Sequence, residues 1–447
     1  MAERSVGPKL PALEHQRGTV GGPVLTEWFA TPELHKLDVY ERLGGYTALR
    51  NVVTGMSAQQ VIDEVKTSGL RGRGGADFAT ATKWSFVPKD HPGPKYVVVN
   101  ADESEPGSAK DRYLLENSPH MLIEGAAIAM FAIGGHQAWV YIRGEYDLPF
   151  EMLRDSIAEA HQKGYLGRHP FGTDYELDLR VYRGHGAYIC GEETGLLESL
   201  EGKRAQPRSR PPFPAIKGAW GMPTIVNNVE TLATVPWIMR HGGTEYAKFG
   251  TEKGNGTRMV TLSGDVQKPG NYEIEIGVTY RHIIEELGGG ALPGRKIKVF
   301  WPGGSSAKVL PASMLDTSTD LDGLKALGTM GGSGGIIVMD DSHCVVKAAA
   351  RLLRFYAFES CGKCTPCRVG GNWAVRTYER ILAGEGSQIE LGILNRVSEG
   401  LQNGRCLCGL GDAAGWVIES TMNHFRNEYE EHCLHHTCSV EAALTLA

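Results

Sequence analysis

The sequence predicts a protein of mixed α/β and α+β class with three folded units in chain order. Up to about residue 248, short apolar strands alternate with helical segments, which favours a largely parallel, Rossmann-like sheet. Over residues 249–340, strands predominate around one short helix, which predicts a small module of the β-grasp (ubiquitin-like) type. From residue 341 onward, apolar residues recur at helical spacing, and we expect a four-helix bundle there.

The same changes of pattern predict the domain boundaries. Residues 1–30 are rich in Gly and Pro and lack periodicity, so we expect a surface arm. The α/β domain is then expected over residues 31–248, the β-grasp domain over residues 249–340 and the helical bundle over residues 341–432, with a C-terminal tail at residues 433–447.

Apolar patterning also predicts the individual elements. In the α/β domain, we expect strands at residues 96–99, 138–142 and 175–181, the last with alternating apolar and charged residues, and an alanine-rich helix at residues 123–133. In the other two units, the expected strands are residues 259–262, 272–276, 297–301 and 336–339, and the expected helices are residues 280–287, 345–359, 373–382, 389–401 and 415–432.

The composition is that of an ordinary globular protein. Hydrophobic residues make up 41% and charged residues 22% of the 447 residues. The net charge of −6 comes without a basic stripe, so nucleic acid is not an expected partner. A run of about 18 apolar residues, which a membrane-spanning helix needs, is absent, and the N-terminus has no features of a signal or transit peptide. Nine cysteines in such a chain indicate a reducing compartment.

Three cysteines with two residues between neighbours form the most informative motif of the chain: Cys361, Cys364 and Cys367. Soft thiolates at this spacing suit an iron–sulfur cluster or zinc. A fourth ligand has to come from elsewhere, and Cys406 and Cys408 are the candidates. Both candidates lie between the last two expected helices, and a four-helix bundle brings such connections together at one end. The pattern therefore indicates a one-electron redox centre.

Polar segments in the α/β region could bind a ligand. Residues 69–78 are rich in glycine, so their backbone N–H groups could face a phosphate, and Lys83 could supply charge. Residues 100–107 carry three acids and an amide directly after the strand at residues 96–99, where α/β sheets bind ligands. Residues 184–194 open a helix whose N-terminus could stabilise a phosphate.

Each such segment also has a simpler interpretation. Residues 100–107 could be a solvated acidic turn. The paired amides of residues 227–231 could read a flat heterocycle, or they could cap a helix. The proline-rich residues 206–214 cannot be helical, and they could form either the wall of a pocket or a plain connector.

Taken together, the segments resemble the NADH-binding flavoprotein subunit (F-type) of respiratory complex I, the NADH:quinone oxidoreductase. The resemblance covers residues 37–432. It is carried by Gly-Leu-Arg-Gly-Arg-Gly-Gly-Ala at 69–76, Asn-Ala-Asp-Glu-Ser-Glu-Pro-Gly at 100–107, Gly-Ala-Tyr-Ile-Cys-Gly-Glu-Glu-Thr at 186–194, Pro-Pro-Phe-Pro-Ala at 211–215, Asn-Asn-Val-Glu-Thr at 227–231 and Glu-Ser-Cys-Gly-Lys-Cys-Thr-Pro-Cys-Arg at 359–368.

The resemblance implies an FMN, a [4Fe–4S] cluster, and NADH as the substrate that stacks on the flavin. The implied FMN contacts are Gly72, Gly74, Lys83, Asn100, Asp102, Glu103, Tyr188, Gly191, Glu192, Asn227, Asn228 and Thr231. The implied NADH contacts are the aromatic residues Phe78, Phe86 and Phe213, which would stack on adenine, and Glu105 and Glu193, which would face the nicotinamide ribose and amide. The implied cluster ligands are Cys361, Cys364, Cys367 and Cys408, the last because it aligns with the family's Leu-Gly-Asp.

The activity implied by the resemblance is that of an NADH dehydrogenase. Hydride would pass from NADH directly to the flavin without a catalytic side chain, and single electrons would then go to the cluster and on towards quinone. The implied partners are a thioredoxin-like [2Fe–2S] subunit and the iron–sulfur subunits of the peripheral arm, on the cytoplasmic side of the inner (plasma) membrane and without membrane insertion. One alternative is the diaphorase subunit of a soluble NAD-reducing hydrogenase or formate dehydrogenase. Another is a non-enzymatic zinc or electron-relay module.

The chain departs from the family pattern in the glycine loop. Where the family usually has Gly-Ala-Gly-Phe-Pro-Thr-Gly, this chain has Asp77, Ala79 and Ala81. Asp77 would place a negative charge beside Phe78, in a pocket meant for a dinucleotide. The C-terminal tail is a second open point, because either a zinc site or a disordered end could explain its thiols and imidazoles: His432, Cys433, His435, His436 and Cys438.

Overall fold

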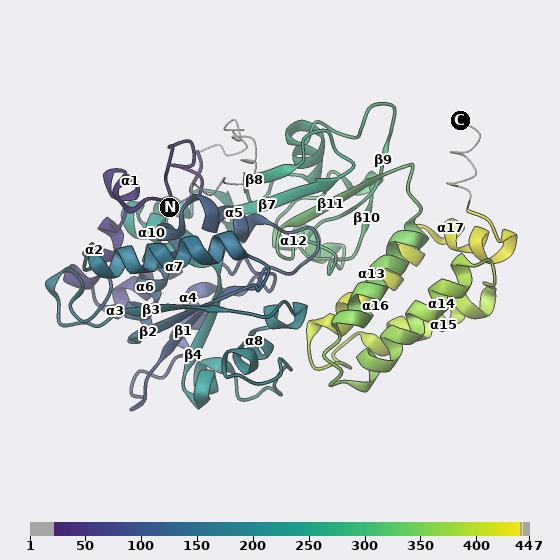
Figure 1. Ribbon diagram of the computed structural model, residues 1–447. Coiled ribbons are helices and arrows are strands. Elements are labelled where there is room, and N and C mark those ends of the chain that lie inside the picture. The colour runs from purple at the N-terminus through teal and green to yellow at the C-terminus, as the bar shows by residue number, and fades with distance from the viewer. Residues whose placement is uncertain (1–21, 439, 441–447) are drawn as a thin grey trace, which may run out of the picture.

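The computed structural model describes residues 22–438 and residue 440. Figure 1 shows an α/β domain that contains β1–β4, a second sheet that contains β7–β11, and a helical bundle that begins with α13. The bundle contacts both other units: the ring of Tyr188 lies 5.1 Å from that of Phe355, and Lys308 Nζ lies 2.9 Å from Glu419 Oε1. The three kinds of architecture confirm the expected fold class.

The α/β domain is built on a four-stranded sheet in the order β3-β2-β1-β4, and every pairing is parallel. Its strands are β1 (Tyr96–Ala101), β2 (Gln137–Ile142), β3 (Asp178–Arg183) and β4 (Thr224–Asn228). Helices cover both faces. Val97 and Val99 face the large core under α6 and α10, whereas Val98 faces α8. Burial on both faces explains why β1 is apolar throughout instead of alternating.

The helices of this domain are α1 (Leu37–Arg42), α2 (Thr47–Gly55), α3 (Ala58–Ser68), α4 (Thr80–Ser85), α5 (Lys110–Asn117), α6 (Pro119–Ile133), α7 (Asp147–Gln162), α8 (Glu193–Leu200), α9 (Pro214–Lys217), α10 (Val229–His241) and α11 (Gly243–Tyr246). The expected alanine-rich helix is α6, which is buried along nearly its whole length. The strand expected at residues 175–181 begins later, at Asp178, because Leu177 pairs with Gly167 in a separate antiparallel bridge.

The second unit is a five-stranded sheet in the order β10-β9-β11-β7-β8. Its strands are β7 (Thr257–Gly264), β8 (Gly270–Glu275), β9 (Ile297–Trp301), β10 (Leu310–Pro311) and β11 (Gly335–Asp340), preceded by a small ribbon of β5 (Gly250–Thr251) and β6 (Gly254–Asn255). The helix expected at residues 280–287 forms with π geometry over His282–Leu287, and α12 (Leu321–Ala326) adds a further short helix.

The C-terminal unit contains α13 (Val345–Glu359), α14 (Gly371–Leu382), α15 (Gln388–Leu401), α16 (Gly409–His424) and α17 (Arg426–Glu430). The prediction of one helix over residues 415–432 is wrong at both ends. The helix starts at Gly409, whose glycine-rich first turn hides it from the periodicity, and it breaks at Phe425 before α17. Among the described residues, no helix is both long and apolar enough to cross a membrane.

The two ends of the described chain pack against the domains. Val24 and Leu25, within the expected N-terminal arm, are buried, and their N–H groups donate to the carboxylate of Glu273 in β8 at 3.0 Å. At the other end, Cys433 is buried in the bundle core. Residues 1–21, 439 and 441–447 lie outside the described part of the chain, so the expectations for them are not addressed.

Candidate functional site

The strand order places the predicted nucleotide residues at one edge of the parallel sheet. The chain runs from β1 through β2 to β3 on one side and then returns to place β4 on the other side of β1. Such a switch point is where open α/β sheets bind ligands, beyond the carboxyl ends of the strands. In the β1–β4 register, Asn100 lies opposite Asn228, and Val99 lies opposite Asn227. Two polar segments far apart in sequence therefore meet side by side.

Asp102 lies just beyond β1 and offers an unused acceptor. Its Oδ2 accepts a hydrogen bond from Ser104, whereas its buried Oδ1 has no partner within the described chain. Burial raises the pKa of this carboxyl to about 7. Nearby, Asn100 Nδ2 donates to the Gly191 carbonyl at 2.9 Å, which ties the 184–194 segment to the end of β1. A buried acceptor without a donor suits a hydroxyl of a bound ligand.

The glycine loop lies against the start of α10. Gly72 N–H donates to the Phe78 carbonyl at 2.8 Å, and Arg73 N–H donates to Thr231 Oγ1 at 2.9 Å. A Cβ on Gly74 would lie 3.0 Å from the Cβ of Asn228, so the close approach requires a glycine. The glycine loop therefore lies beside Asn228 and Thr231, and Gly72, Gly74, Asn228 and Thr231 are among the FMN contacts that the resemblance implies.

Lys83 and Glu193 form one polar group. Lys83 Nζ lies 2.9 Å from Glu193 Oε2 and donates to the Val226 carbonyl at 2.7 Å. Arg210 Nη1 reaches the other oxygen of Glu193 at 3.1 Å. A predicted FMN ligand and a predicted NADH ligand are therefore in direct contact, and two cations flank one carboxylate.

Three exposed aromatic side chains surround this region. Phe78 is 47%, Phe86 52% and Phe213 57% exposed. The ring centroids of Phe78 and Phe86 are 6.1 Å apart with an interplanar angle of 47°. Large exposed aromatic rings of this kind mark a surface that stacks on a partner rather than one that fills a core.

Glu105 lies where the three units meet. Its carboxylate accepts hydrogen bonds from Tyr188 Oη at 2.7 Å, from Ser305 Oγ at 2.9 Å and from Ser306 N–H at 2.7 Å. The Ser305 hydroxyl is in turn 2.8 Å from Tyr356 Oη in α13. Burial raises the pKa of Glu105 above its usual range. Both serines lie in the β-grasp unit, where the sequence predicted no functional residue.

Three of the predicted FMN ligands also cap the N-termini of helices. Glu103 accepts the N–H groups of Asp111 and Arg112 at 3.0 Å and so caps α5. Glu192 accepts the N–H groups of Thr194 and Gly195 at 2.9 and 2.8 Å and caps α8. Both carboxylates hold helix N-termini at the edge of the site. Asn228 likewise caps α10, through Glu230 N–H at 3.0 Å.

A buried ion cluster beside the site was not found from the sequence. Lys110 Nζ lies 2.8 Å from Asp111 Oδ1, 2.7 Å from Glu230 Oε2 and 3.3 Å from Asn228 Oδ1. Burial would lower the pKa of Lys110, but the adjacent carboxylates of Asp111 and Glu230 outweigh it and raise that pKa above its usual value. In the sequence, only Glu230, within the motif at residues 227–231, pointed to this cluster. Nothing in the sequence distinguishes Lys110 from a surface lysine.

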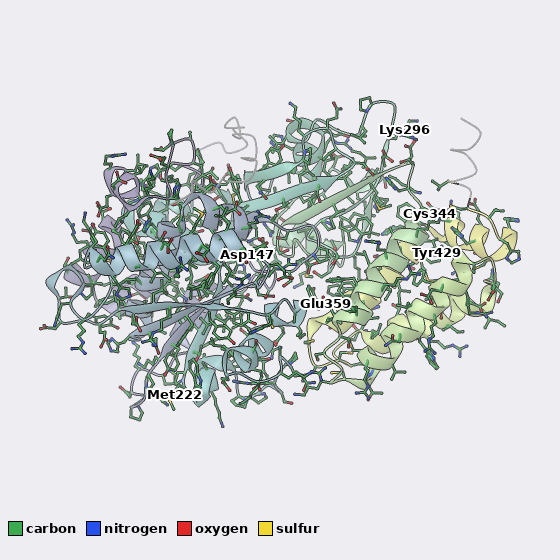
Figure 2. All side chains as sticks on the ribbon, in the orientation of Figure 1. Asp147, Met222, Lys296, Cys344, Glu359 and Tyr429 are labelled. Carbon is green, nitrogen blue, oxygen red and sulfur yellow. The ribbon has the colours of Figure 1, made fainter. Side chains whose placement is uncertain are left out.

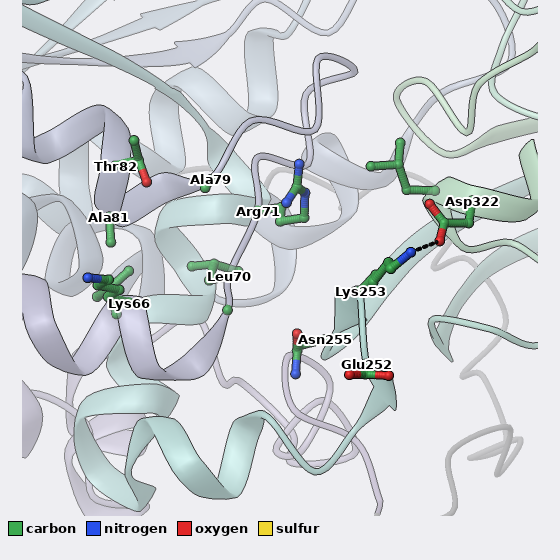
Figure 3. Close-up of a pocket in the computed structure, with 13 residues that line it drawn as sticks. Lys66, Leu70, Arg71, Ala79, Ala81, Thr82, Glu252, Lys253, Asn255 and Asp322 are labelled. Carbon is green, nitrogen blue, oxygen red and sulfur yellow. Dashed lines mark hydrogen bonds and ion pairs between the residues drawn. The ribbon is translucent and has the colours of Figure 1, made fainter. Parts of the chain in front are cut away.

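Asp77 takes the left-handed conformation, with φ at 50°. Its carboxylate lies 3.7 Å from Arg71 Nε and 3.6 Å from Arg73 Nη1, so two guanidinium groups offset its charge. Ala79 and Ala81, which follow Asp77, line a hollow of about 340 Å³. Figure 3 shows this hollow, with Lys66 and Asp322 also among the residues that line it. This hollow shares the loop with the nucleotide site but not the sheet edge.

The cysteines form a second centre at the Glu359 end of α13, next to the α/β domain. One hollow is lined by Ile189, Ser360, Cys361, Cys364, Cys367, Cys406, Cys408, Leu410 and Gly411. Leu407 N–H donates to Cys364 Sγ at 3.2 Å, and Ser360 Oγ lies 3.1 Å from Cys367 Sγ. Burial raises the pKa of the Cys408 thiol to about 12. Soft sulfur donors in this number, with hydrogen bonds aimed at them, suit an iron–sulfur cluster.

One segment touches both centres. Tyr188 donates its hydroxyl to Glu105 and packs its ring against Phe355, and the next residue, Ile189, lines the cysteine hollow. Tyr188 N–H also donates to the Glu359 carboxylate at 3.1 Å, at the end of α13. A nucleotide-type α/β site and a cysteine-lined bundle joined in this way define a flavin- and iron–sulfur-dependent oxidoreductase.

Comparisons with known proteins agree with this class. A family model described as the Nuo51 FMN-binding domain matches residues 65–237, one described as an SLBB domain matches residues 259–310, and one described as the NADH-ubiquinone oxidoreductase-F iron-sulfur binding region matches residues 347–432. The second F-type subunit of the NADH-quinone oxidoreductase of Rhizobium meliloti (strain 1021) is 48% identical over 93% of this chain and 99% of its own length. The F-type subunit of Streptomyces coelicolor is 45% identical over 95% of this chain and 94% of its own length.

The chain belongs to the family of F-type subunits of NADH-quinone oxidoreductase. Its cofactors are FMN and a [4Fe–4S] cluster, its substrate is NADH, and its role is that of the flavoprotein subunit of an NADH dehydrogenase. As a member of this family, it works within a complex of several subunits. Among solved structures, that of an NAD+-reducing [NiFe]-hydrogenase in the H2-reduced state is similar with a TM-score of 0.81 and 34% identity, over 95% of this chain and 69% of that chain.

Proposed function

We propose that electrons enter this protein at the β1/β4 switch point and leave it through the cysteine hollow. FMN would lie at the carboxyl ends of β1 and β4, and NADH would approach from the exposed side of the same site. The observation that carries this route is the contact of Tyr188 with Glu105 on one side and of Ile189 with the cysteine hollow on the other.

The proposed FMN-holding residues are Gly72, Gly74, Lys83, Asn100, Asp102, Glu103, Tyr188, Gly191, Glu192, Asn227, Asn228 and Thr231. The β1–β4 register and the hydrogen bonds of Arg73, Lys83 and Asn100 support this set. Within this set, the tasks differ. Asp102 offers a free acceptor oxygen, and Lys83 offers a cation. Glu103, Glu192 and Asn228 act through the helix N-termini that they cap.

The proposed NADH-binding residues are Phe78, Phe86, Phe213, Glu105 and Glu193. The three phenylalanines are exposed at the rim, where stacking on adenine would bury them. Glu193 is held by Lys83 and Arg210, and Glu105 by Tyr188, Ser305 and Ser306, so each carboxylate has a fixed orientation before substrate arrives. Preorganised acceptors of this kind orient ribose and amide groups without a cost of reorganisation.

The cofactors supply the electron chemistry: bound FMN accepts a hydride and returns electrons singly, and a bound [4Fe–4S] cluster accepts single electrons. The protein therefore needs no side chain as a proton acid or base for this step. Its residues would bind and orient the two cofactors, and Tyr188 and Ile189 would fill the space between them. Leu407 N–H and Ser360 Oγ point at cysteine sulfurs.

We further propose that Cys361, Cys364, Cys367 and Cys408 are the cluster ligands and that Cys406 is not. Cys406 is the more buried of the two candidates, and its Sγ packs towards Gly411, where an added Cβ would lie only 2.5 Å from it. Cys408 is less buried and occupies the N-cap position of α16. The backbone N–H groups at a helix N-terminus favour the thiolate, the form that binds iron, and so oppose the rise in the pKa of Cys408 that burial causes.

Paired variants test this assignment. Cys408→Ala is expected to lose the paramagnetic signal of the reduced cluster and most of its iron, whereas Cys406→Ala keeps both. FMN content and circular dichroism, measured in the same samples, confirm folding. A cluster that survives Cys408→Ala and disappears in Cys406→Ala would show that the ligand lies two residues earlier.

For partners and location, the proposal is a thioredoxin-like [2Fe–2S] subunit and the iron–sulfur subunits of a peripheral arm, on the cytoplasmic side of the inner membrane. The identities of 48% and 45% to two F-type subunits support this assembly. The second candidate is a diaphorase subunit, which the 34% identity to an NAD+-reducing hydrogenase supports less strongly. Affinity purification of the tagged chain from whole cells lysed in mild detergent decides: membrane subunits and quinone reduction support the first, and a nickel-containing partner supports the second.

A further inference from the structure

A third group of sulfur and nitrogen ligands lies at the opposite end of α13 from the cluster cysteines. Cys344 precedes α13, and Glu359 ends it, and Figure 2 labels both ends. A helix of this length spans about 22 Å. At the Cys344 end, the ligand atoms of Cys344, His432 and Cys438 all lie within 4.8 Å of one another. No residue of this group lines the cysteine hollow.

We propose that Cys344, His432 and Cys438 bind one Zn²⁺ ion. Tetrahedral zinc with ordinary Zn–S and Zn–N bonds holds its sulfurs about 3.8 Å apart and sulfur and nitrogen about 3.6 Å apart. Cys344 Sγ and His432 Nε2 are 3.3 Å apart, so the group needs only small side-chain adjustments to close around the ion. Two thiolates and one imidazole are a ligand set that selects zinc over harder cations.

Burial and charge at the site agree with a bound dication. Cys344 is 6% and His432 5% exposed, so two ligands lie in the bundle interior, while Cys438 closes the group from the edge. The two thiolates neutralise the ion. Glu428, whose charge acts on the Cys344 thiol, is already bonded to Val345 N–H at 2.9 Å and to Lys298 Nζ at 2.6 Å. A water molecule would therefore complete the fourth position of the ion.

The ion would join segments that are distant in the chain. Cys344 is the residue before the first helix of the bundle, and His432 and Cys438 come after α17, 88 and 94 residues later. A bound zinc ion would therefore link the segment after α17 to the start of α13. This group cannot be the site of the [4Fe–4S] cluster, because it offers only two thiolates and such clusters are held by four cysteines.

The test is the zinc content of the full-length chain that carries FMN and its cluster. The protein is equilibrated with one equivalent of ZnCl₂, desalted and analysed for zinc, iron and FMN. Wild-type protein and Cys433→Ser are expected to retain one zinc per chain. Cys433 is the matched control. It is a buried thiol directly after His432 in the chain, but its sulfur packs towards Gly386 and not towards the proposed ion. Cys344→Ser and Cys438→Ser are expected to lose zinc while iron and FMN stay unchanged.

Zinc X-ray absorption gives a second readout. The wild-type spectrum is expected to show two sulfur ligands at about 2.3 Å and nitrogen or oxygen ligands at about 2.0–2.1 Å. If Cys344→Ser does not fold, Cys438→Ser decides alone, because its side chain is at the edge of the bundle. Wild-type protein without zinc, a Cys344–Cys438 disulfide in its place, zinc retained in both variants, or iron lost together with zinc would each overturn the proposal.

Discussion

At the residue scale, charged groups of the site are offset by side chains whose contacts with them the sequence alone does not show. Asp77 is the clearest case. As a substitution in a glycine loop, it suggested simple repulsion of a dinucleotide. In the structure, its carboxylate lies between Arg71 and Arg73, and its φ of 50° is one that aspartate tolerates. Its charge would therefore act on a bound NADH mainly by lowering the positive potential of the two arginines.

Asp77→Asn is accordingly expected to tighten NADH binding. The carboxylate is 33% exposed, so solvent screens it, and the gain should be at most about fivefold at low salt. The Kd for NADH, measured at low and high ionic strength, should show an effect that shrinks as salt rises. Asp174→Asn, at a fully exposed carboxylate on the same domain, is the control. Equal Kd values for Asp77→Asn and wild type at low salt would contradict this role.

Asp102 predicts a pH dependence. Burial raises its pKa in the folded, FMN-free protein to about 7 from 3.8, so folding favours the protonated form. Its contribution to stability is therefore complete below pH 3.8 and is lost as the pH rises through 7. Between these limits, the free energy of unfolding of FMN-free wild type should fall relative to Asp102→Asn by up to about 4 kcal/mol.

Urea midpoints of both FMN-free proteins at several pH values between about 5 and 8 measure this difference. Asparagine does not titrate, so the variant supplies the reference. A constant difference across this range would mean that Asp102 titrates at its ordinary pKa, and the buried acceptor would then be hydrated.

At the scale of elements, close contacts between helices and strands decide which residues are tolerated. The helix α6 lies against α10 at Gly125, where an added Cβ would be 1.9 Å from the Leu232 carbonyl oxygen. Two backbones this close leave no side chain to move aside. Gly74 is a milder case, because its added Cβ would lie 3.0 Å from the side-chain Cβ of Asn228. In both places, a distant segment approaches the glycine closely, which the local sequence does not reveal.

Gly125→Ala is therefore expected to destabilise the α/β domain, by about 1–3 kcal/mol or more, although alanine favours helices. Gly55→Ala is the matched control. Gly55 ends a helix of this domain, but its added Cβ meets nothing within 4 Å, so this change should be neutral or slightly stabilising. Thermal unfolding with FMN bound compares the two, and equal melting temperatures would show that α6 and α10 can separate at little cost.

At the scale of the whole molecule, the three units converge on Glu105. This α/β-domain carboxylate is held by Tyr188, by Ser305 and Ser306 of the β-grasp unit and, through Ser305, by Tyr356 of the bundle. The cysteine hollow lies on the other side of Tyr188 and Ile189. The domain arrangement therefore sets the distance between hydride entry and electron exit.

Cys364→Ala separates these two halves. Hydride transfer needs only the nucleotide site, so NADH:ferricyanide activity should persist, whereas electron delivery to quinone in the assembled complex should be lost. Lys83→Ala should lower both activities, because it weakens the nucleotide site that both require. FMN content and circular dichroism are the folding controls. A folded, FMN-replete Cys364→Ala complex that reduced quinone at the normal rate would place the cluster off the electron path.

From the sequence alone, the class of fold could be predicted, and the cysteine run and the candidate site segments could be proposed as functional. Each of these depends on a pattern among residues that are close together in the chain: the apolar period, the glycine clusters and the cysteine spacing. The sequence also placed α13 at its observed bounds, because a regular apolar period fills that helix.

The early start of α16 was missed for a local reason, because its glycine-rich first turn conceals the apolar period. Three other features could be established only from the folded chain: Asn100 lies opposite Asn228 across the β1–β4 register, Lys110 is buried between Asp111 and Glu230, and the side chain of Asp77 turns towards two arginines of its own loop. The physical reason is that burial, strand pairing and side-chain direction depend on three-dimensional neighbours, whereas a linear pattern gives only the order of residues along the chain.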